Sequence, residues 1–400
     1  TFFFSGRDTM LIEDVRLFYL AMPEIQDIGD GSQDALLIRI ESEGVVGWGE
    51  CEASPLVSIA NWICPMSHSA CKSVRDAVVG QRIETPEDIV KLGHAVRAAG
   101  LDIAQTDHTW SGVEIALWDL LGKRLDEPVY RLLGFDEALP KTPYASQLFG
   151  DTPDSTLEKA RQCRQQGFSA VKFGWASYGC GTVAEDNAHV EAARAGLGEE
   201  GTLLIDAGTV WNEDVDAARQ RLAALEAHRV LWLEEPFVGE ALHAYGELAK
   251  SCHKVQLAGG EGASNFHAAR NLIDHGGIGF VQIDTGRIGG IAPAKAVADY
   301  AAQCNVVYVN HTFTTHLALA ASIVPYAGDA QSVICEFPVE ASRLALDLVE
   351  QPLSLVEGKV QLNDRPGLGV DINEATIEKY LVPVEIKVRG KTTYSTPDLA

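Results

Sequence analysis

The chain has 400 residues, of which 32 are basic and 56 acidic, and its formal net charge at pH 7 is −24. Such an excess of negative charge argues against nucleic acid or an anionic membrane surface as a partner. The length predicts one large domain or two, and no apolar run approaches the roughly 20 residues that a membrane helix needs, so we expect a cytoplasmic protein.

The opening "TFFFSGRDTM" lacks the basic and long apolar regions of a signal peptide, so we interpret residues 1–10 as a poorly ordered leader. The eight cysteines are scattered without C-x-x-C spacing. This distribution is typical of reduced thiols rather than of a zinc site or a disulfide framework.

The first third of the chain has strand patterns followed by helix patterns. Stretches 15–22, 35–42 and 45–53 predict a three-stranded meander whose last two strands meet at a short Glu-Gly turn near Glu43. Apolar residues at helical spacing follow, most clearly in "TWSGVEIALWDLLGKRL", where Ser111 is a candidate N-cap. This order of elements indicates an α+β unit, which we assign to residues 1–138.

From Tyr144 onward, short apolar runs alternate with amphipathic segments of helical length. The strand candidates are "YASQLF", "AVKFGW", "TLLIDAG", "VLWLEEP", "VQLAGGE", "GFVQIDT", "VVYVNHT" and "SVICEFP". Eight such units favour a (β/α)8-type barrel, assigned to residues 139–345, in which helices cover the strands. An open doubly wound sheet is the alternative, but "LAGGEG" and "RIGGIA" lack the G-x-G-x-x-G spacing of a dinucleotide site.

The alternation ends after Pro338. The stretch "LVEGKVQLNDRPGLGVDI" predicts two short strands and a turn, which are too small to fold alone. We therefore expect the tail, residues 346–400, to return to the N-terminal unit.

Polar side chains stand at the ends of seven successive predicted strands: Lys172, Asp206, Glu234, Glu261, Asp284, His311 and Glu336. Because the carboxyl ends of parallel barrel strands meet at one rim, we expect these side chains to converge on one mouth. Strand ends are often polar simply because loops are hydrated, but this does not explain seven in a row.

Three of these residues are acids that end three successive predicted strands: Asp206, Glu234 and Glu261. Acids brought together without a cation repel each other and raise each other's pKa values. A hard divalent cation removes the conflict, and all-oxygen ligation favours Mg²⁺, which we predict to face Glu234. Glu235 points the other way along the strand and is expected either to support the metal-binding residues from behind or to anchor a loop.

Asp284 and His311 end neighbouring strands, where an aspartate can orient a histidine that acts as a base. A lone histidine is more often structural, but His311 follows an apolar run and has an acid beside it, so we predict a catalytic role. His316 is expected to be structural. His68 is a weaker candidate for a loop that closes over the site.

The ordered set of motifs "LLIDAG", "WLEEP", "LAGGEG", "IDTGRIGG", "VNHTF" and "ICEFP" resembles the mandelate racemase subgroup of the enolase superfamily. The stretch "SGVEIALWDLLGKRLDEPVYRLLG" is similar to that family's junction between cap and barrel. The resemblance implies an α/β fold with a modified TIM barrel of the (β/α)7β type. It also implies an α+β N-terminal capping domain that the C-terminal tail completes.

The resemblance also implies a reaction. The three strand-end acids would hold Mg²⁺, and an Asp284–His311 dyad would remove the proton α to a substrate carboxylate. Glu336 would hydrogen-bond that carboxylate as it becomes an enediolate.

One position departs from the family pattern. Racemases of this subgroup carry K-x-K on the second barrel strand, with the second lysine as the base on the opposite face, whereas "AVKFGW" has Lys172 and then Gly174. Lys172 either pairs with the metal-binding carboxylates or binds the substrate carboxylate. Without a base on each face, β-elimination is favoured over 1,1-proton transfer. Tyr178, in the loop "WASYGCG", is a speculative source of an acid.

We therefore expect a Mg²⁺-dependent dehydratase that converts a small hydroxy-carboxylate, an acid sugar, into a 2-keto-3-deoxy acid. The first alternative is a racemase or epimerase, and a remote one is a catalytically inactive binding protein, against which the retained acids and His–Asp pair argue. Cycloisomerases of the superfamily carry a base lysine where this chain has Asp284, so they are less expected. Loops 21–33 and 55–71 are expected to set specificity, and a homo-oligomer is expected on general grounds.

Overall fold

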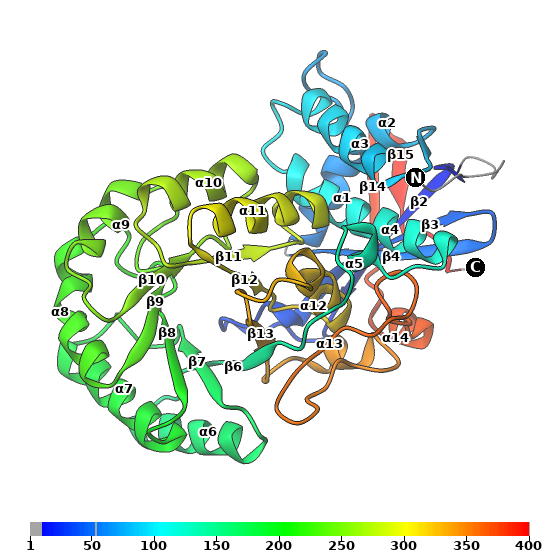
Figure 1. Ribbon diagram of the computed structural model, residues 1–400. Coiled ribbons are helices and arrows are strands. Elements are labelled where there is room, and N and C mark those ends of the chain that lie inside the picture. Colours follow the sequence, from blue (N-terminus) through cyan, green and yellow to red (C-terminus); the bar gives the residue numbers. More distant parts are fainter. Residues whose placement is uncertain (1–9, 53, 400) are drawn as a thin grey trace.

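The computed structural model describes residues 10–52 and 54–399. Figure 1 shows a barrel of strands surrounded by helices, with a smaller α+β cap beside it that both ends of the chain join. The predicted leader lies outside the described residues except for Met10, which is buried. Among the described residues, no helix combines the length and the apolar character needed to cross a membrane.

The cap is built on the predicted three-stranded antiparallel meander. Its strands β2 (Asp14–Ala21), β3 (Asp34–Ser42) and β4 (Val45–Cys51) pair in chain order. Glu43 and Gly44 form the turn between β3 and β4 with positive φ angles of 53° and 78°, the conformation that tight hairpins require. The short strands β1 (Met10–Leu11) and β5 (Arg82–Ile83) form a separate antiparallel pair.

The cap also contains helices. They are η1 (Gly31–Gln33), α1 (Pro55–Ile63), α2 (Val74–Val78), α3 (Pro86–Ala99), α4 (Thr106–Leu125) and α5 (Val129–Leu132). The longest, α4, packs directly on β4 because two glycines of that strand leave room for it. A Cβ built on Gly47 would lie 2.2 Å from the carbonyl oxygen of Ala116, and one on Gly49 would lie 2.1 Å from that of Gly112.

The prediction of Ser111 as an N-cap is wrong. Helix α4 begins at Thr106, and Thr109 and Trp110 extend its buried face upstream of Ser111. Within the helix, the Ser111 hydroxyl donates to the carbonyl of Asp107 and accepts from the backbone N–H of Gly289 in the barrel. Ser111 therefore joins cap to barrel rather than starting a helix.

The barrel has eight parallel strands in the order β12-β11-β10-β9-β8-β7-β6-β13. The strands are β6 (Thr142–Leu148), β7 (Ala170–Gly174), β8 (Thr202–Asp206), β9 (Val230–Glu234), β10 (Gln256–Gly259), β11 (Phe280–Asp284), β12 (Val307–His311) and β13 (Ile334–Pro338). The helices between them are α6 (Pro153–Gln165), α7 (Val183–Leu197), α8 (Val215–Ala227), α9 (Leu242–Ala249), α10 (Phe266–His275), α11 (Ile291–Gln303) and α12 (His316–Ile323), the last followed by η2 (Val324–Tyr326). The (β/α)7β prediction is confirmed.

A side chain closes the barrel between its seventh and eighth strands, β12 and β13. No backbone ladder joins β12 to β13; instead the backbone N–H of Glu336 donates to Asn310 Oδ1 at 2.9 Å. The Tyr326 hydroxyl donates to the same oxygen at 2.7 Å. Asn310 is fully buried, so these bonds are shielded from water.

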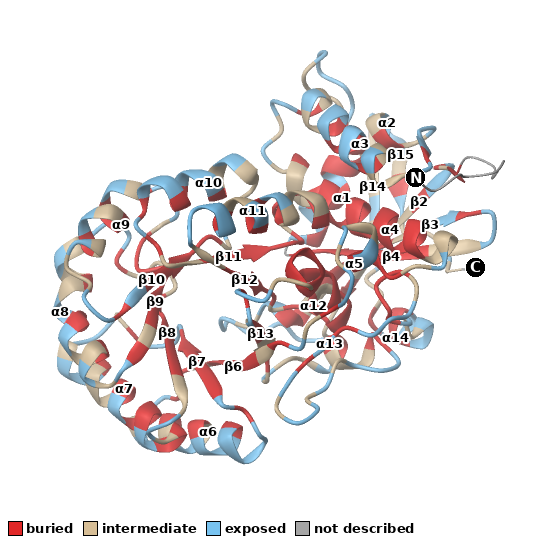
Figure 2. Cartoon of the chain, viewed as in Figure 1, coloured by how far each residue is buried: buried red, intermediate tan, exposed pale blue. Residues whose placement is uncertain are grey.

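Burial follows this architecture, as Figure 2 shows: the barrel strands are buried, and the surrounding helices are exposed on their outer faces. The barrel interior contains an apolar layer that includes Tyr144, Leu204, Trp232 and Val309. It is therefore a packed core, and its open space lies at the strand ends.

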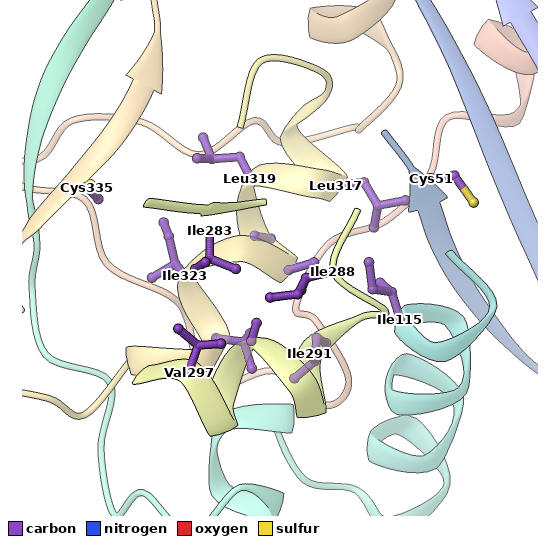
Figure 3. Close-up of a cluster of buried hydrophobic side chains, with 14 of the residues drawn as sticks. Cys51, Ile115, Ile283, Ile288, Ile291, Val297, Leu317, Leu319, Ile323 and Cys335 are labelled. Atoms are coloured by element: carbon purple, nitrogen blue, oxygen red, sulfur yellow. The ribbon is translucent and has the colours of Figure 1, made fainter. Parts of the chain in front are cut away.

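Cap and barrel share one hydrophobic core. In Figure 3, Ile115 of α4 lies beside Ile288 and Ile291 of the barrel, and Leu317 of α12 lies toward Cys51 of β4. All five are buried, and burying a side chain of the size of isoleucine or leucine stabilises a fold by about 1.5–3 kcal/mol. This packing fixes the cap against the barrel.

The tail returns to the cap, as predicted. It contains α13 (Arg343–Asp347), α14 (Glu374–Tyr380) and a hairpin of β14 (Glu385–Val388) and β15 (Lys391–Ser395). The backbone N–H of Val382 donates to the carbonyl of Tyr19, and the Tyr394 hydroxyl donates to that of Leu17, both on β2. Figure 1 shows β14 and β15 next to β2.

Two short strands were predicted within residues 355–372, and this is wrong. The stretch makes isolated bridges, such as Lys141 with Val360, because Gly358, Gly367 and Gly369 have positive φ angles that interrupt a ladder. The domain limits at 138/139 and 345/346 stay predictions; the second falls within α13.

Candidate active site

The barrel strands bring the predicted site residues to one end of the barrel. The ladder register pairs Gly174 with Asp206, Asp206 with Glu234, and Asp284 with His311 on neighbouring strands. Glu261 follows β10 by two residues. Because these pairs lie side by side in a parallel sheet, their carboxylates and the imidazole converge.

A pocket of about 300 Å³ lies between these strand ends and the cap. Four of the predicted residues line it: Lys172, Asp206, Glu261 and His311. The other three are buried and do not line it: Glu234, Asp284 and Glu336. Four of the seven side chains thus reach the pocket surface, and the other three lie behind it.

The cap contributes to this pocket through one of its two predicted specificity loops. Residues 28–31 of loop 21–33 line the pocket, together with Glu52. Loop 55–71 contributes no lining residue, since its first half forms α1.

Lys172 is the positive group that meets Glu234 in this structure. Its Nζ lies 2.6 Å from Glu234 Oε1, 2.9 Å from Glu336 Oε1 and 3.6 Å from Asp206 Oδ2. The Trp232 Nε1–H donates to the second oxygen of Glu234 at 3.0 Å. Burial alone would lower the pKa of Lys172, but these carboxylates raise it well above its ordinary value. A permanent ammonium therefore lies among three buried acids.

Two of these acids hold protons more tightly than usual. Burial raises the pKa of Asp206 to about 6 and that of Glu234 to about 8, although Lys172 opposes both shifts. Repulsion from Glu261 adds to the rise in each case. Burial and mutual repulsion therefore both disfavour the ionised forms of these two acids.

Glu336 behaves differently because it has more donors. It accepts hydrogen bonds from the Ser146 hydroxyl and from the backbone N–H of Thr312, each at 2.8 Å. Burial alone would raise its pKa, but Lys172 and His311 hold it below its ordinary value. An ionised Glu336 is an acceptor only, so in this conformation it holds Lys172 rather than donating to a substrate.

His311 and Asp284 contact each other as predicted from the sequence. His311 Nδ1 lies 2.7 Å from Asp284 Oδ2, and the backbone N–H of Gly286 donates to Asp284 Oδ1 at 2.7 Å. The other ring nitrogen, Nε2, is 3.2 Å from Glu261 Oε2. Burial alone would lower the pKa of His311, but Glu261, Glu336 and Asp284 raise it to about 10. Asp284 thus fixes the ring so that Nε2 is the nitrogen available to a ligand.

Sequence reasoning missed an ion pair that joins cap to barrel at this pocket. Arg287, after β11, binds both carboxylate oxygens of Glu52, after β4, with Nη2 2.8 Å from Oε1. Its Nη1 lies 3.5 Å from Glu261 Oε1. Arg287 stood within the motif "IDTGRIGG", but no local pattern shows that it meets a residue 235 positions away.

Four further residues were considered from the sequence. Tyr178 is buried, stacks on Phe149 with ring centroids 5.0 Å apart and does not line the pocket, so it is not placed to donate a proton there. The carboxylate of Glu235 accepts from the backbone N–H of Gly260 at 3.4 Å, which anchors the loop after β10.

The two remaining histidines lie outside the pocket. His316 starts α12 and packs on Phe337, and burial lowers its pKa to about 4, as suits a structural group. His68 lies 2.7 Å from Asp102 on an exposed part of the cap and does not line the pocket.

Comparison with known proteins agrees with this architecture. The family "Enolase C-terminal domain-like" matches residues 155–376, and the family "Mandelate racemase / muconate lactonizing enzyme, N-terminal domain" matches residues 25–134. The crystal structure of a predicted mandelate racemase from Rhodobacter sphaeroides is 51% identical, with a TM-score of 0.93. That match covers 97% of this chain and 100% of that one.

Two relatives with named activities are more distant. The L-talarate/galactarate dehydratase of Salmonella typhimurium is 28% identical over 314 residues, 77% of this chain and 74% of that protein. The D-galactarolactone cycloisomerase of Agrobacterium fabrum is 27% identical over 371 residues, 87% of this chain and 91% of that protein. Since the two family matches span the cap and most of the barrel, the chain belongs to the mandelate racemase/muconate lactonizing enzyme family of the enolase superfamily.

Proposed function

We propose that the protein is a Mg²⁺-dependent dehydratase that removes the α-proton of an acid sugar and eliminates its β-hydroxyl to give a 2-keto-3-deoxy acid. The observation that carries the proposal is the Asp284–His311 pair, which presents its imidazole to a pocket that also contains Lys172 and strand-end acids. The similarity to an L-talarate/galactarate dehydratase supports it.

Asp206, Glu234 and Glu261 would hold the metal. Their hard oxygen donors suit Mg²⁺, and a bound cation would offset the burial and the mutual repulsion that raise the pKa values of Asp206 and Glu234. Among the described residues, no group of three His, Cys, Asp or Glu side chains is already arranged around a common point. The donor chemistry therefore fits the ion, while Lys172 competes for two of its ligands.

When bound, Mg²⁺ would stabilise the negative charge that develops on the substrate carboxylate. The pKa of about 10 keeps His311 protonated at neutral pH here, with Glu261 the first of the charges that raise it. If Glu261 were instead a metal ligand, that charge would be withdrawn, and the neutral ring would take the α-proton on Nε2. The Asp284 carboxylate would hold Nδ1–H and stabilise the imidazolium that forms. Lys172, paired with Glu336 at 2.9 Å, would donate a hydrogen bond to the enediolate. The leaving hydroxyl takes up one proton, so water and the enol of the keto acid are the products.

Isomerisation is the second candidate, because a D-galactarolactone cycloisomerase is also a relative. Racemisation in particular needs a second base on the opposite face, and Gly174 offers no side chain there. The two functions differ in product: a dehydratase releases a 2-keto acid, whereas an isomerase keeps the composition of its substrate.

The test is to incubate the purified protein and Mg²⁺ with mono- and diacid sugars in D₂O, measuring 2-keto acid and following the α-carbon by NMR. We expect a 2-keto-3-deoxy acid, an unchanged α-configuration in the remaining substrate, and reversible loss of activity with EDTA. Accumulation of the α-epimer at the rate of turnover, or full activity in a metal-free protein, would contradict the proposal.

A matched pair of variants isolates the dyad. His311→Asn should reduce kcat by about 100-fold or more, because general base catalysis contributes factors of this size. His68→Asn breaks a second His–Asp pair with the same separation, 2.7 Å, that lies outside the pocket, and should leave kcat unchanged.

A further inference from the structure

The pocket has two chemically different sides. On the deep side, Lys172, Asp206 and His311 are each at most 6% exposed. On the outer side, Ile28 is 51% and Trp175 is 47% exposed, although both are large apolar residues. Apolar side chains that line a pocket mouth are available to cover a ligand.

Four apolar side chains line the outer part, and we call them the apolar wall: Ile28, Leu148, Trp175 and Phe313. The wall comes from both domains, since Ile28 belongs to the cap and the others to the barrel. The cap backbone approaches closely at Gly29, where an added Cβ would lie 3.3 Å from both the Leu148 side chain and the Trp175 ring. The wall is therefore built by contact between cap and barrel.

The position of Trp175 is fixed by the backbone. Trp175 and Ala176 both have positive φ angles, 56° and 55°, which non-glycine residues adopt rarely. A Cβ on Gly208 would lie 3.0 Å from the indole ring, so that ring rests on a residue without a side chain. Such strain at a pocket mouth is typical of residues held for a ligand.

The basic groups of the pocket are already paired. Among the described residues that line it, Lys172 and Arg287 are the lysine and arginine side chains. Lys172 binds Glu234 and Glu336, and Arg287 binds both oxygens of Glu52.

The outer side adds an acid instead of a base. Asp30 lines the pocket beside Ile28, and its Oδ1 accepts from the Ser32 backbone and hydroxyl. A ligand carboxylate placed there would lose water, gain no cation and face a like charge.

Building on the proposed function, we infer that the substrate is a monocarboxylic acid sugar whose end remote from the reacting carboxylate is uncharged and presents C–H surface to the apolar wall. A substrate with a carboxylate at each end, such as the galactarate named for one relative, would be disfavoured. The protein would then catalyse the same type of reaction as that relative, but on a substrate with one carboxylate instead of two.

The experiment compares three acids that differ only at the remote carbon: galactonate, 6-deoxygalactonate and galactarate, with the gluco and manno series in parallel. Binding is measured by titration calorimetry with Mg²⁺ on the His311→Asn protein, and kcat/KM for 2-keto acid formation on the wild type. In whichever series binds, we expect the diacid to bind at least about tenfold more weakly than both monoacids, since an unpaired carboxylate costs more than 1.4 kcal/mol. A diacid that binds as well as the monoacids would overturn the inference.

Two arginine variants on one loop provide the matched control. Ile28→Arg places a cation in the apolar wall and should improve diacid binding relative to monoacid by about tenfold or more. Ile25→Arg adds the same charge at a residue that is 57% exposed and does not line the pocket, and should leave the ratio unchanged. Equal shifts in both variants, or none in either, would show that the wall does not face the remote end.

These measurements separate the two proposals. If monoacids bind preferentially but none is dehydrated, the proposed function fails and the inference stands. If dehydration occurs with the diacid preferred, the inference fails and the function stands. If none of these acids binds, both fail.

Discussion

Gly174 lies directly against Asp206: a Cβ built on Gly174 would be 2.8 Å from the Cβ and 3.0 Å from Oδ2 of that aspartate. The two residues are ladder partners at the ends of β7 and β8. The position where related racemases carry their second lysine is therefore closed here by the neighbouring acid. A larger residue at position 174 would therefore require Asp206 to move.

Substitution of Gly174 should therefore damage the site rather than convert it. We expect Gly174→Ala to reduce kcat/KM by about tenfold or more, because Asp206 must move by several tenths of an ångström. Gly174→Lys should lose dehydration without producing the α-epimer, as checked by NMR in D₂O. The control is Gly262→Ala, beside Glu261, where an added Cβ meets no atom within 4 Å. Epimerisation by Gly174→Lys at a rate near wild-type turnover would contradict this.

Lys172→Met should make the free energy of unfolding depend on Mg²⁺. Without the ammonium, Glu234, Asp206 and Glu336 lose their shared partner, and breaking a buried ion pair costs about 3–5 kcal/mol. We expect a lower free energy of unfolding in EDTA that Mg²⁺ restores in part, because a divalent cation replaces the lost charge. Denaturant unfolding with and without Mg²⁺ measures this. Lys159→Met, which breaks the more exposed pair with Glu340, should cost about 1 kcal/mol or less and show no Mg²⁺ rescue.

Glu336→Gln tests whether this carboxylate acts through Lys172. Since Glu336 holds the ammonium at 2.9 Å and does not line the pocket, we expect kcat to fall by about 10- to 100-fold with little change in KM. Glu340→Gln, which removes the comparable partner of Lys159, should change neither constant. A rise in KM with kcat unchanged would instead make Glu336 an ordinary binding residue.

Glu50 should make stability depend on pH. Burial raises its pKa to about 7, although the Thr315 hydroxyl, which donates to it, opposes the shift. The folded state therefore binds a proton that the unfolded state has already released, and stability falls as pH rises from about 4.5 to about 7.

The size of this effect can be measured by substitution. Above the folded pKa the ionised group costs on the order of 3 kcal/mol, so Glu50→Gln should be more stable than wild type at pH 8.5 and similar to it near pH 5. Denaturant unfolding across this range checks the difference between the two curves. The exposed Glu24→Gln serves as the control, and parallel curves for wild type and Glu50→Gln would show that Glu50 does not titrate there.

The residues that end the repeated barrel strands could be predicted from the sequence. Contacts between residues far apart in the chain could not. Asp206, Asp284 and His311 could be placed because each ends a regular strand, and parallel strands share one rim. The pairing of Glu52 with Arg287 could not, because it depends on how the cap docks. No local rule links the two segments.

The local errors have equally local causes. Ser111 follows the pattern of an N-cap, yet the buried residues before it continue the helix. Tyr178 lies in a loop near the pocket, but its ring is buried against Phe149 and does not line the pocket. For both residues, tertiary packing decides the outcome, although the local sequence pattern was interpreted correctly.

The side-chain closure at Asn310 has a consequence for heat inactivation. Backbone ladders join all the other neighbouring strand pairs of the barrel, whereas β12 and β13 are joined by hydrogen bonds that involve side chains. That junction lies between His311 and Glu336. A barrel that begins to open there would separate the imidazole from the carboxylate that holds Lys172 while the other strands stay paired. Enzyme activity would therefore be lost at a lower temperature than secondary structure. The difference between these two temperatures would measure the stability of the β12–β13 junction.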